Sequence, residues 1–181
     1  VVIYMAASLF VIADYLRTQY GWYGKFLCSD GVKDKLQESV VRIVGGYSEG
    51  SGFFIADDQV ITNFHVIADE PSPKIIFPDG KFVTPIKIVG NKDADLAVLF
   101  TDSPYPKIVL PLPDEIGIRE SEPLIAIGYA LGTDLTGKAT VLKGNFVDFR
   151  TSKKQPVAYI QTSISLVQGM SGGPLTDQCG H

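Results

Sequence analysis

The chain is poor in cysteine and histidine, the residue types that most often mark metal and acid–base sites. Its 181 residues include two cysteines, Cys28 and Cys179, and two histidines, His65 and His181. Two cysteines exclude a disulfide-dense scaffold and a cysteine-based zinc site. We expect two separate thiols, although the even number also permits one disulfide. Because His181 ends the sequence, a reaction that needs a histidine base points to His65.

Positive charge is also scarce. The chain carries 16 Lys and Arg against 20 Asp and Glu, and its one basic cluster, Arg150 to Lys154, has the composition of a solvated turn. No basic face is visible, so we expect no nucleic-acid partner. A composition that is 45% hydrophobic and 20% charged is that of a globular domain. The 18 glycines and 11 prolines favour turns and short strands over long helices.

Long hydrophobic runs are absent except at the N-terminus. The stretch VVIYMAASLFVIADYL is almost entirely apolar up to Asp14, and the aromatic-rich YGWYGKF follows Arg17. A transmembrane helix needs about 20 apolar residues, with Trp and Tyr at the interface. Two interpretations stay open for residues 1–20: the end of a membrane anchor, which we favour, or an amphipathic helix packed on the domain or on a partner. Residues 21–38 read as a linker, with one helical turn at 34–37.

From Ser39 onward, short apolar runs alternate with turn signals about every ten residues, a pattern typical of a β-barrel or sandwich. A proline-rich connection divides these runs into two sets, so we expect β-barrels over 39–111 and 112–181. Pro85 inside one run indicates an edge or a bulge, and PDG at 78–80 indicates a hairpin turn. The predicted strands are 39–45, 51–56, 59–62, 74–77, 82–89, 95–100, 123–129, 138–149 and 156–162.

Three short stretches carry residues that could do chemistry together. They are ITNFHVI at 61–67, DADLAVLF at 93–100 and QGMSGGPL at 168–175. Taken alone, each residue of interest has an ordinary structural explanation: a surface histidine, a turn aspartate and a serine in a glycine turn. Together they supply what serine-based acyl transfer needs, namely a hydroxyl, an imidazole to take its proton and a carboxylate to orient the imidazole. Glycines beside the serine permit the tight turn that aims backbone N–H groups at an oxyanion.

These motifs resemble those of chymotrypsin-fold serine proteases, and within that class the HtrA (Deg) group. The resemblance covers about residues 39–175 and includes GSGFFI at 50–55 and QTS at 161–163. It implies an all-β fold with a double six-stranded β-barrel. Only TDQCGH follows Leu175 in this sequence, so we expect the second barrel to be incomplete (truncated), and an apolar helix to precede the first.

The resemblance implies a role for each matching residue. Ser171 is the expected nucleophile, His65 the general base and Asp95 the residue that orients His65. The backbone N–H groups of Gly169 and Ser171 are the expected oxyanion hole, and Leu166 is expected to line the substrate pocket. With no acid near that pocket, we expect cleavage after small or medium aliphatic residues.

Two neighbouring residues need separate comment. Asp93 also precedes the strand, but the motif match places the orienting acid at Asp95, so we expect Asp93 to be a surface turn residue. Met170 replaces the Asn or Asp that is commoner beside the nucleophile. Its backbone matters more than its side chain in that position, so the change does not exclude activity.

The resemblance implies a serine endopeptidase that acts on proteins or peptides without a metal or cofactor. We expect a membrane-anchored protein whose catalytic domain is extracytoplasmic, with a role in protein quality control or regulated proteolysis. A homotrimer built on N-terminal aromatic contacts is a further expectation. The alternatives are an inactive protease fold that serves as a binding or chaperone module, and a subunit of a membrane assembly.

Overall fold

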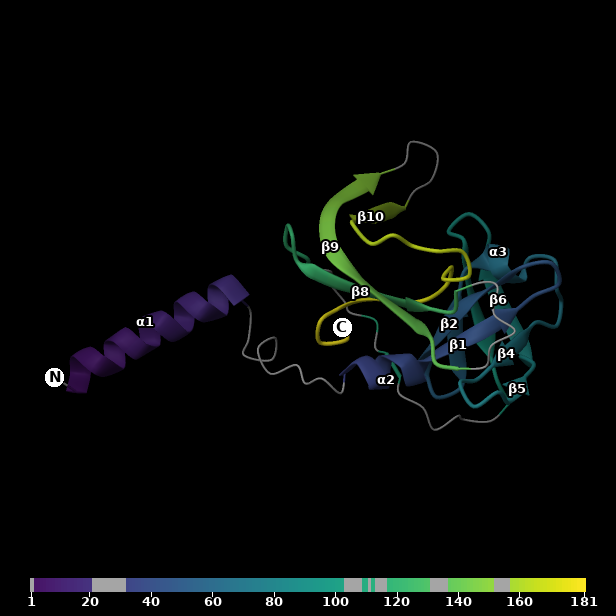
Figure 1. The fold of residues 1–181 in the computed structure, drawn as a ribbon, viewed down its shortest axis with the longest axis horizontal. Coiled ribbons are helices and arrows are strands. Elements are labelled where there is room, and N and C mark those ends of the chain that lie inside the picture. Colours follow the sequence, from purple (N-terminus) through teal and green to yellow (C-terminus); the bar gives the residue numbers. More distant parts are fainter. Residues whose placement is uncertain are drawn as a thin grey trace.

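Two antiparallel sheets form the body of the protein (Figure 1). The computed structural model describes residues 2–20, 32–102, 109–110, 112, 117–130, 137–151 and 157–181. Within these residues one sheet has seven strands and the other has four. The protein is therefore mostly β, as the sequence predicts. The predicted domain limits themselves stay a prediction, because the stretch between the sheets lies largely outside the described residues.

The seven-stranded sheet has the order β5-β4-β1-β2-β3-β7-β6. Its side chains alternate between buried and less buried positions, as in β1 and β3, because one face covers a core. That core includes Val41, Ile43, Phe54, Val60 and Leu99. The strands are β1 (Val40–Val44), β2 (Glu49–Ala56), β3 (Gln59–Thr62), β4 (Lys74–Ile76), β5 (Phe82–Val83), β6 (Lys87–Asn91) and β7 (Leu96–Phe100).

The expectation of six strands in the first barrel is corrected at one place. The predicted strand 82–89 is two strands, β5 and β6, which pair with different neighbours. Pro85 lies between them, and its missing N–H cannot continue a ladder. The PDG turn joins β4 to β5 as predicted, with Gly80 at φ 84°.

The four-stranded sheet has the order β10-β9-β8-β11 and curls into a half-barrel (Figure 1). Its strands are β8 (Pro123–Gly128), β9 (Thr140–Thr151), β10 (Ala158–Thr162) and β11 (Leu175–Asp177), of which β11 is absent from the predicted set. Strand β8 is buried on both faces. Ile125 and Ile127 join a core with Leu36, whereas Leu124 and Ala126 join another core. This two-sided burial explains the continuous apolar run of β8.

In the described part of the chain, three helices accompany the sheets: α1 (Val2–Tyr20), α2 (Val32–Ser39) and α3 (Phe64–Ile67). Helix α2 is longer than the predicted single turn and buries Leu36 against the second sheet. Lys138, just before β9, contacts Asp34 of α2 at 2.9 Å. This ion pair lowers the pKa of Asp34 and raises the pKa of Lys138.

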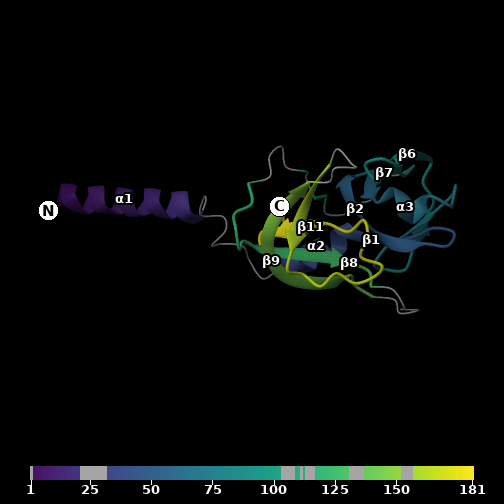
Figure 2. The same cartoon turned by 90° about the horizontal axis from the view of Figure 1, so that it is seen from above.

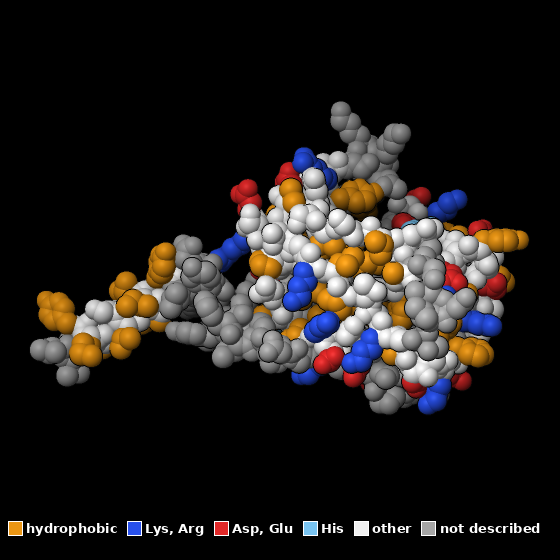
Figure 3. Space-filling model, in the orientation of Figure 1, with side chains coloured by type: hydrophobic (Ala, Val, Ile, Leu, Met, Phe, Trp, Pro, Cys, Tyr) orange, Lys and Arg blue, Asp and Glu red, His pale blue; other side chains and the backbone are white. Residues whose placement is uncertain are grey.

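Helix α1 lies apart from the β body in two perpendicular views (Figures 1 and 2). Its apolar side chains are solvent-exposed, as the space-filling view shows (Figure 3), with Tyr4 82% and Phe10 73% exposed. The helix expected at residues 1–20 is present. None of the helices in the described part of the chain, however, combines the length and hydrophobicity needed to cross a membrane.

Two further expectations concern the cysteines and the basic cluster. The expected pair of separate thiols is wrong, because Cys179 is disulfide-bonded. The only other cysteine, Cys28, lies outside the described residues.

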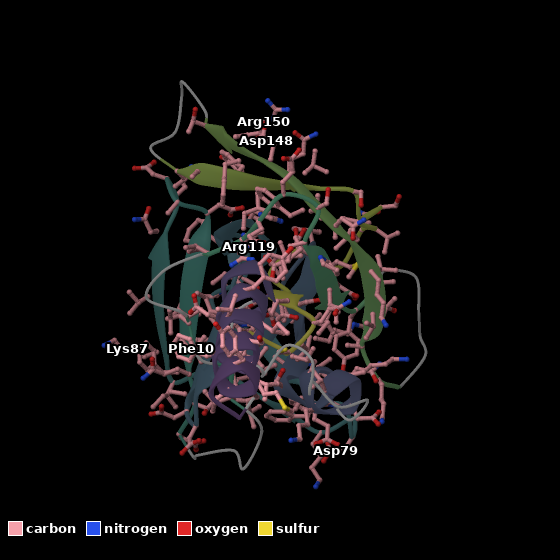
Figure 4. All side chains as sticks on the ribbon, turned by 90° about the vertical axis from the view of Figure 1, so that its left-hand side faces the viewer. Phe10, Asp79, Lys87, Arg119, Asp148 and Arg150 are labelled. Carbon is pink, nitrogen blue, oxygen red and sulfur yellow. The ribbon has the colours of Figure 1, made fainter. Side chains whose placement is uncertain are left out.

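In the basic cluster, Arg150 lies on β9. Its side chain pairs with Asp148 at 3.3 Å and donates a hydrogen bond to Gln161 (Figure 4). The rest of that cluster, except Thr151, lies outside the described residues.

Candidate active site

His65 and Asp95 meet because two strands pair. Strand β3 runs antiparallel to β7 with Thr62 opposite Ala97, so the residues after β3 lie beside those before β7. Helix α3 then begins and carries His65. The Asp95 carbonyl accepts hydrogen bonds from the backbone N–H of Phe64 at 3.1 Å and from Asn63 Nδ2 at 2.8 Å. Residues 63–65 and Asp95 are thus held together before any side chain of the candidate triad is considered.

The Asp95 carboxylate binds His65 with both oxygens. Oδ2 lies 2.7 Å from His65 Nδ1, and Oδ1 accepts the His65 backbone N–H at 2.9 Å. Since a carboxylate accepts, Nδ1 is the donor, and in the neutral imidazole Nε2 then carries the lone pair. Such an imidazole can take a proton from a hydroxyl. The pair is more open than the buried carboxylate of the usual triad, because the His65 and Asp95 side chains are 56% and 40% exposed.

Asp95 has an unusual backbone conformation that suits this arrangement. Its φ is 53°, in the left-handed region, where Asp is better tolerated than most residues. The turn before it is stabilised by Asn91, whose Oδ1 accepts the N–H groups of Asp93 and Ala94. Asp93 is exposed in this turn, as expected, and among the described residues it is Asp95, not Asp93, whose carboxylate bonds to His65. The structure thus pairs His65 with Asp95 rather than with Asp93.

Ser171 lies in a tight loop that packs on β2 and the end of β3. Gly169 and Gly172 have φ values of 93° and 85°, which glycine adopts at little cost. A Cβ on Gly172 would lie 2.2 Å from the Ser51 carbonyl oxygen and 2.4 Å from Thr62 Oγ1, so the loop approaches β2 and β3 too closely for a side chain. The backbone N–H of Ser51 donates to the Ser171 carbonyl at 2.7 Å.

The Ser171 loop lies next to the helix that carries His65. A Cβ on Gly50 would lie 2.7 Å from the Val66 side chain and 2.8 Å from the Ser171 carbonyl oxygen. Gly50 therefore lies between α3 and the Ser171 loop, where there is no room for a side chain. Both side chains of interest are exposed, and among the described residues neither hydroxyl nor imidazole hydrogen-bonds the other. The structure brings the three residues to one place and joins two of them directly.

The remaining predicted residues lie in the Ser171 loop or on the stretch of chain just before it. Among the described residues, the backbone N–H groups of Gly169 and Ser171 have no hydrogen-bond acceptor. Met170 is buried in the core with Leu124 and Ala126. Leu166 is 60% exposed on the stretch that leads into the loop.

Ser51 is a residue of this region to which the sequence patterns assign no role. Its hydroxyl donates to the Gly169 carbonyl at 2.8 Å and is itself fully buried. The signal for it was the Gly-Ser-Gly pattern of β2, since glycines on both sides of a serine indicate close backbone approach.

One group of possible metal ligands lies away from this site. Asp177, Cys179 and His181 have ligand atoms within 4.8 Å of one another. Cys179 is disulfide-bonded and offers no thiolate. Asp177 Oδ1 already accepts the N–H groups of Cys179 and His181, so this group serves as the turn after β11.

Serine proteases are among the known proteins that this chain resembles in sequence and fold. The model for the trypsin-like peptidase domain matches residues 50–181. The chain is 31% identical to mitochondrial serine protease HTRA2 of Bos taurus over 74% of this chain and 30% of that protein. It is also 31% identical to a probable periplasmic serine endoprotease, DegP-like, of Rhizobium meliloti, over 74% of this chain and 26% of that protein.

Among solved structures, the HtrA-type protease AlgW with tripeptide is 26% identical, with a TM-score of 0.72 over 83% of this chain and 50% of that chain. This chain thus spans about half of the AlgW chain and less than a third of the two curated relatives. The resemblance inferred from the motifs is confirmed. The chain belongs to the trypsin-like peptidase family, in which HtrA-type serine proteases are its relatives.

Proposed function

We propose that this chain is the catalytic domain of a serine endopeptidase, with Ser171 as nucleophile, His65 as general base and Asp95 as the residue that orients His65. The observation that carries the proposal is the two-point contact of the Asp95 carboxylate with His65 beside the Ser171 loop. Two relatives that are named as serine proteases support the same conclusion.

The proposed reaction forms and hydrolyses an acyl-enzyme. Ser171 Oγ bonds to the carbonyl carbon of the scissile peptide while its proton passes to His65 Nε2. The carbonyl oxygen becomes negatively charged and accepts the N–H groups of Gly169 and Ser171. Collapse of this intermediate expels the amine, which takes the proton from His65. Water then repeats the sequence at the ester, releasing the acid and restoring the Ser171 hydroxyl.

Leu166 is proposed to contact the residue before the scissile bond. Its exposed, uncharged side chain favours small or medium aliphatic residues at that position, because no acid stands on the stretch 163–170 to attract Lys or Arg. A peptide library gives the test. A cleavage profile dominated by basic residues would contradict the assignment.

An extracytoplasmic location is proposed for the domain. Disulfides persist in oxidising compartments, and Cys179 is disulfide-bonded. A relative named as periplasmic supports the same location.

We further propose that the exposed apolar side chains of α1 attach the domain to a membrane. We also propose that the protein acts in quality control or regulated proteolysis, and that it forms a homotrimer. Light scattering that gives a monomeric mass would rule out the trimer.

A fluorophosphonate probe tests the central proposal. The full-length protein is expected to be labelled, and Ser171→Ala is expected to abolish labelling. Ser165→Ala is the matched control, because Ser165 is an exposed serine on the same stretch of chain and is expected to leave labelling unchanged. Labelling that survives Ser171→Ala would refute the assignment of the nucleophile.

A non-catalytic binding module is the second candidate. The observation that favours it is that the Ser171 hydroxyl makes no hydrogen bond with His65. Protease-fold modules of this kind usually lack a triad member, whereas this chain keeps all three. Absence of labelling in the folded full-length protein would favour this second candidate.

A further inference from the structure

Ser51 holds the Ser171 loop through both its backbone and its side chain. Its hydroxyl donates to the Gly169 carbonyl at 2.8 Å and accepts the backbone N–H of Tyr129 at 2.8 Å. Its own N–H donates to the Ser171 carbonyl at 2.7 Å. One fully buried residue of β2 thus connects the nucleophile loop to the end of β8.

The two bonds to the loop lie on either side of one peptide group. The Gly169 carbonyl belongs to the peptide that precedes Met170, and the Ser171 carbonyl belongs to the peptide that follows Ser171. Between them is the Met170–Ser171 peptide, whose N–H is one of the two proposed oxyanion donors. Fixing both neighbouring carbonyls limits the rotation of the peptide between them, because each peptide group is planar.

We propose that Ser51 is a positioning residue that orients the oxyanion-binding N–H groups and the Ser171 side chain. The inference rests on the proposed function, since it assigns a task within that reaction. Ser51 touches neither substrate nor the reacting atoms. It acts through the loop, where a preorganised donor is worth more than one that must reorient during the reaction.

The surroundings of Ser51 are shaped to this contact. A Cβ on Gly128 would lie 2.8 Å from Ser51 Oγ, and a Cβ on Gly172 would lie 2.2 Å from the Ser51 carbonyl oxygen. Thr62 Oγ1 donates to that same carbonyl at 2.7 Å and holds β2 in place. The Ser51 hydroxyl therefore occupies a space that exists because the neighbouring glycines carry no side chain. The N–H, the carbonyl oxygen and the hydroxyl of Ser51 each have a hydrogen-bond partner.

Met170 supplies the apolar half of the same attachment. Its side chain is buried with Phe146 and Ile164 in the core of the second sheet. The loop is thus held by packing from one sheet and by hydrogen bonds from the other. Removal of the Ser51 hydroxyl would leave the packing intact while the buried Gly169 carbonyl and Tyr129 N–H lose a partner.

Ser51→Ala tests the proposal, with Ser39→Ala as the matched control. Ser39 is also a fully buried serine, and its hydroxyl donates to a backbone carbonyl, that of Leu36, at 2.7 Å. We expect Ser51→Ala to lower kcat about 10- to 100-fold with KM within about twofold, and to slow fluorophosphonate labelling equally. Ser39→Ala is expected to change stability without changing these rates. Should Ser51→Ala not fold, Ser51→Cys, which is similar in size but a weak donor, replaces it.

Hydrogen exchange of the backbone amides at 168–173 gives a second readout that does not depend on activity. We expect exchange there to be faster in Ser51→Ala than in Ser39→Ala and the unmutated protein. Unchanged kcat and labelling in Ser51→Ala would overturn the proposal. So would an equal loss of activity in Ser51→Ala and Ser39→Ala. If the unmutated protein is inactive, the proposed function fails. Hydrogen exchange at residues 168–173 then decides alone whether Ser51 positions the loop, and exchange that is unchanged in Ser51→Ala would overturn the proposal.

Discussion

Asp95→Asn is the sharpest test of the candidate triad, because the substitution keeps shape and changes hydrogen bonding. Asn tolerates the left-handed conformation of Asp95, whose φ is 53°, so the turn is expected to persist. An amide has one acceptor oxygen where the carboxylate has two. When that oxygen keeps the backbone N–H of His65, the amide NH₂ faces Nδ1 and forces the imidazole proton onto Nε2. His65 then cannot accept the Ser171 proton.

The expected loss follows from the geometry of the pair. Two hydrogen bonds to an ionised carboxylate, at about 1.5–3 kcal/mol each, set an upper limit of about 6 kcal/mol, or about 10⁴-fold in rate. The His65 and Asp95 side chains are 56% and 40% exposed, so solvent screens their interaction. We therefore expect a fall in kcat of about 10²- to 10³-fold, which is smaller than the roughly 10⁴-fold loss in a triad with a buried aspartate.

The assay compares labelling rates and peptide hydrolysis in Asp95→Asn and Asp93→Asn. Asp93 is exposed in the same turn, so its substitution is expected to leave both rates within about twofold. Thermal unfolding of both variants checks that the fold is retained. A loss below about tenfold in Asp95→Asn, or an equal loss in Asp93→Asn, would refute the role given to Asp95.

Two further predictions concern stability and the loop. Among the described residues, the Tyr129 hydroxyl is the buried side-chain oxygen without a hydrogen-bond partner, so Tyr129→Phe is expected to keep stability or raise it by about 1 kcal/mol in urea unfolding. Burial raises the pKa of Tyr129 to about 12, whereas an unfolded tyrosine titrates near 10. The neutral side chain is thus favoured in the folded state, and stability is lost as pH rises from about 10 to about 12. Tyr129→Phe should lose less over that window, and equal losses would contradict the burial argument. Gly172→Ala is expected to abolish labelling, because its Cβ would lie 2.2 Å from a backbone oxygen at a φ of 85°; unchanged labelling would show that the loop can move away from β2.

Several elements could be predicted because their signals are local. The strand pattern from Ser39 onward follows from short apolar runs and turn residues, and the helix at residues 1–20 follows from a nearly continuous apolar run. Pro85 was expected to mark an edge or a bulge of one strand, but it lies between β5 and β6, and the pattern did not show that these two strands would pair with different neighbours. Strand β11 was missed because it has only three residues, Leu175–Asp177, and lies next to a glycine turn. Pairing partners depend on distant segments, which periodicity does not contain.

The sequence by itself determined the chemistry that is available: a histidine, an aspartate and a glycine-flanked serine, in motifs of one protease family. Only the tertiary structure decided which of these groups touch. Pairing of β3 with β7 brings Asp95, the acid that the motif match indicated, into contact with His65, and close packing of β2 places Ser51 against the loop of Ser171. Residue types report which bonds are possible, but each bond needs two groups within about 3 Å. For groups far apart in the chain, that distance is set by strand register and glycine contacts.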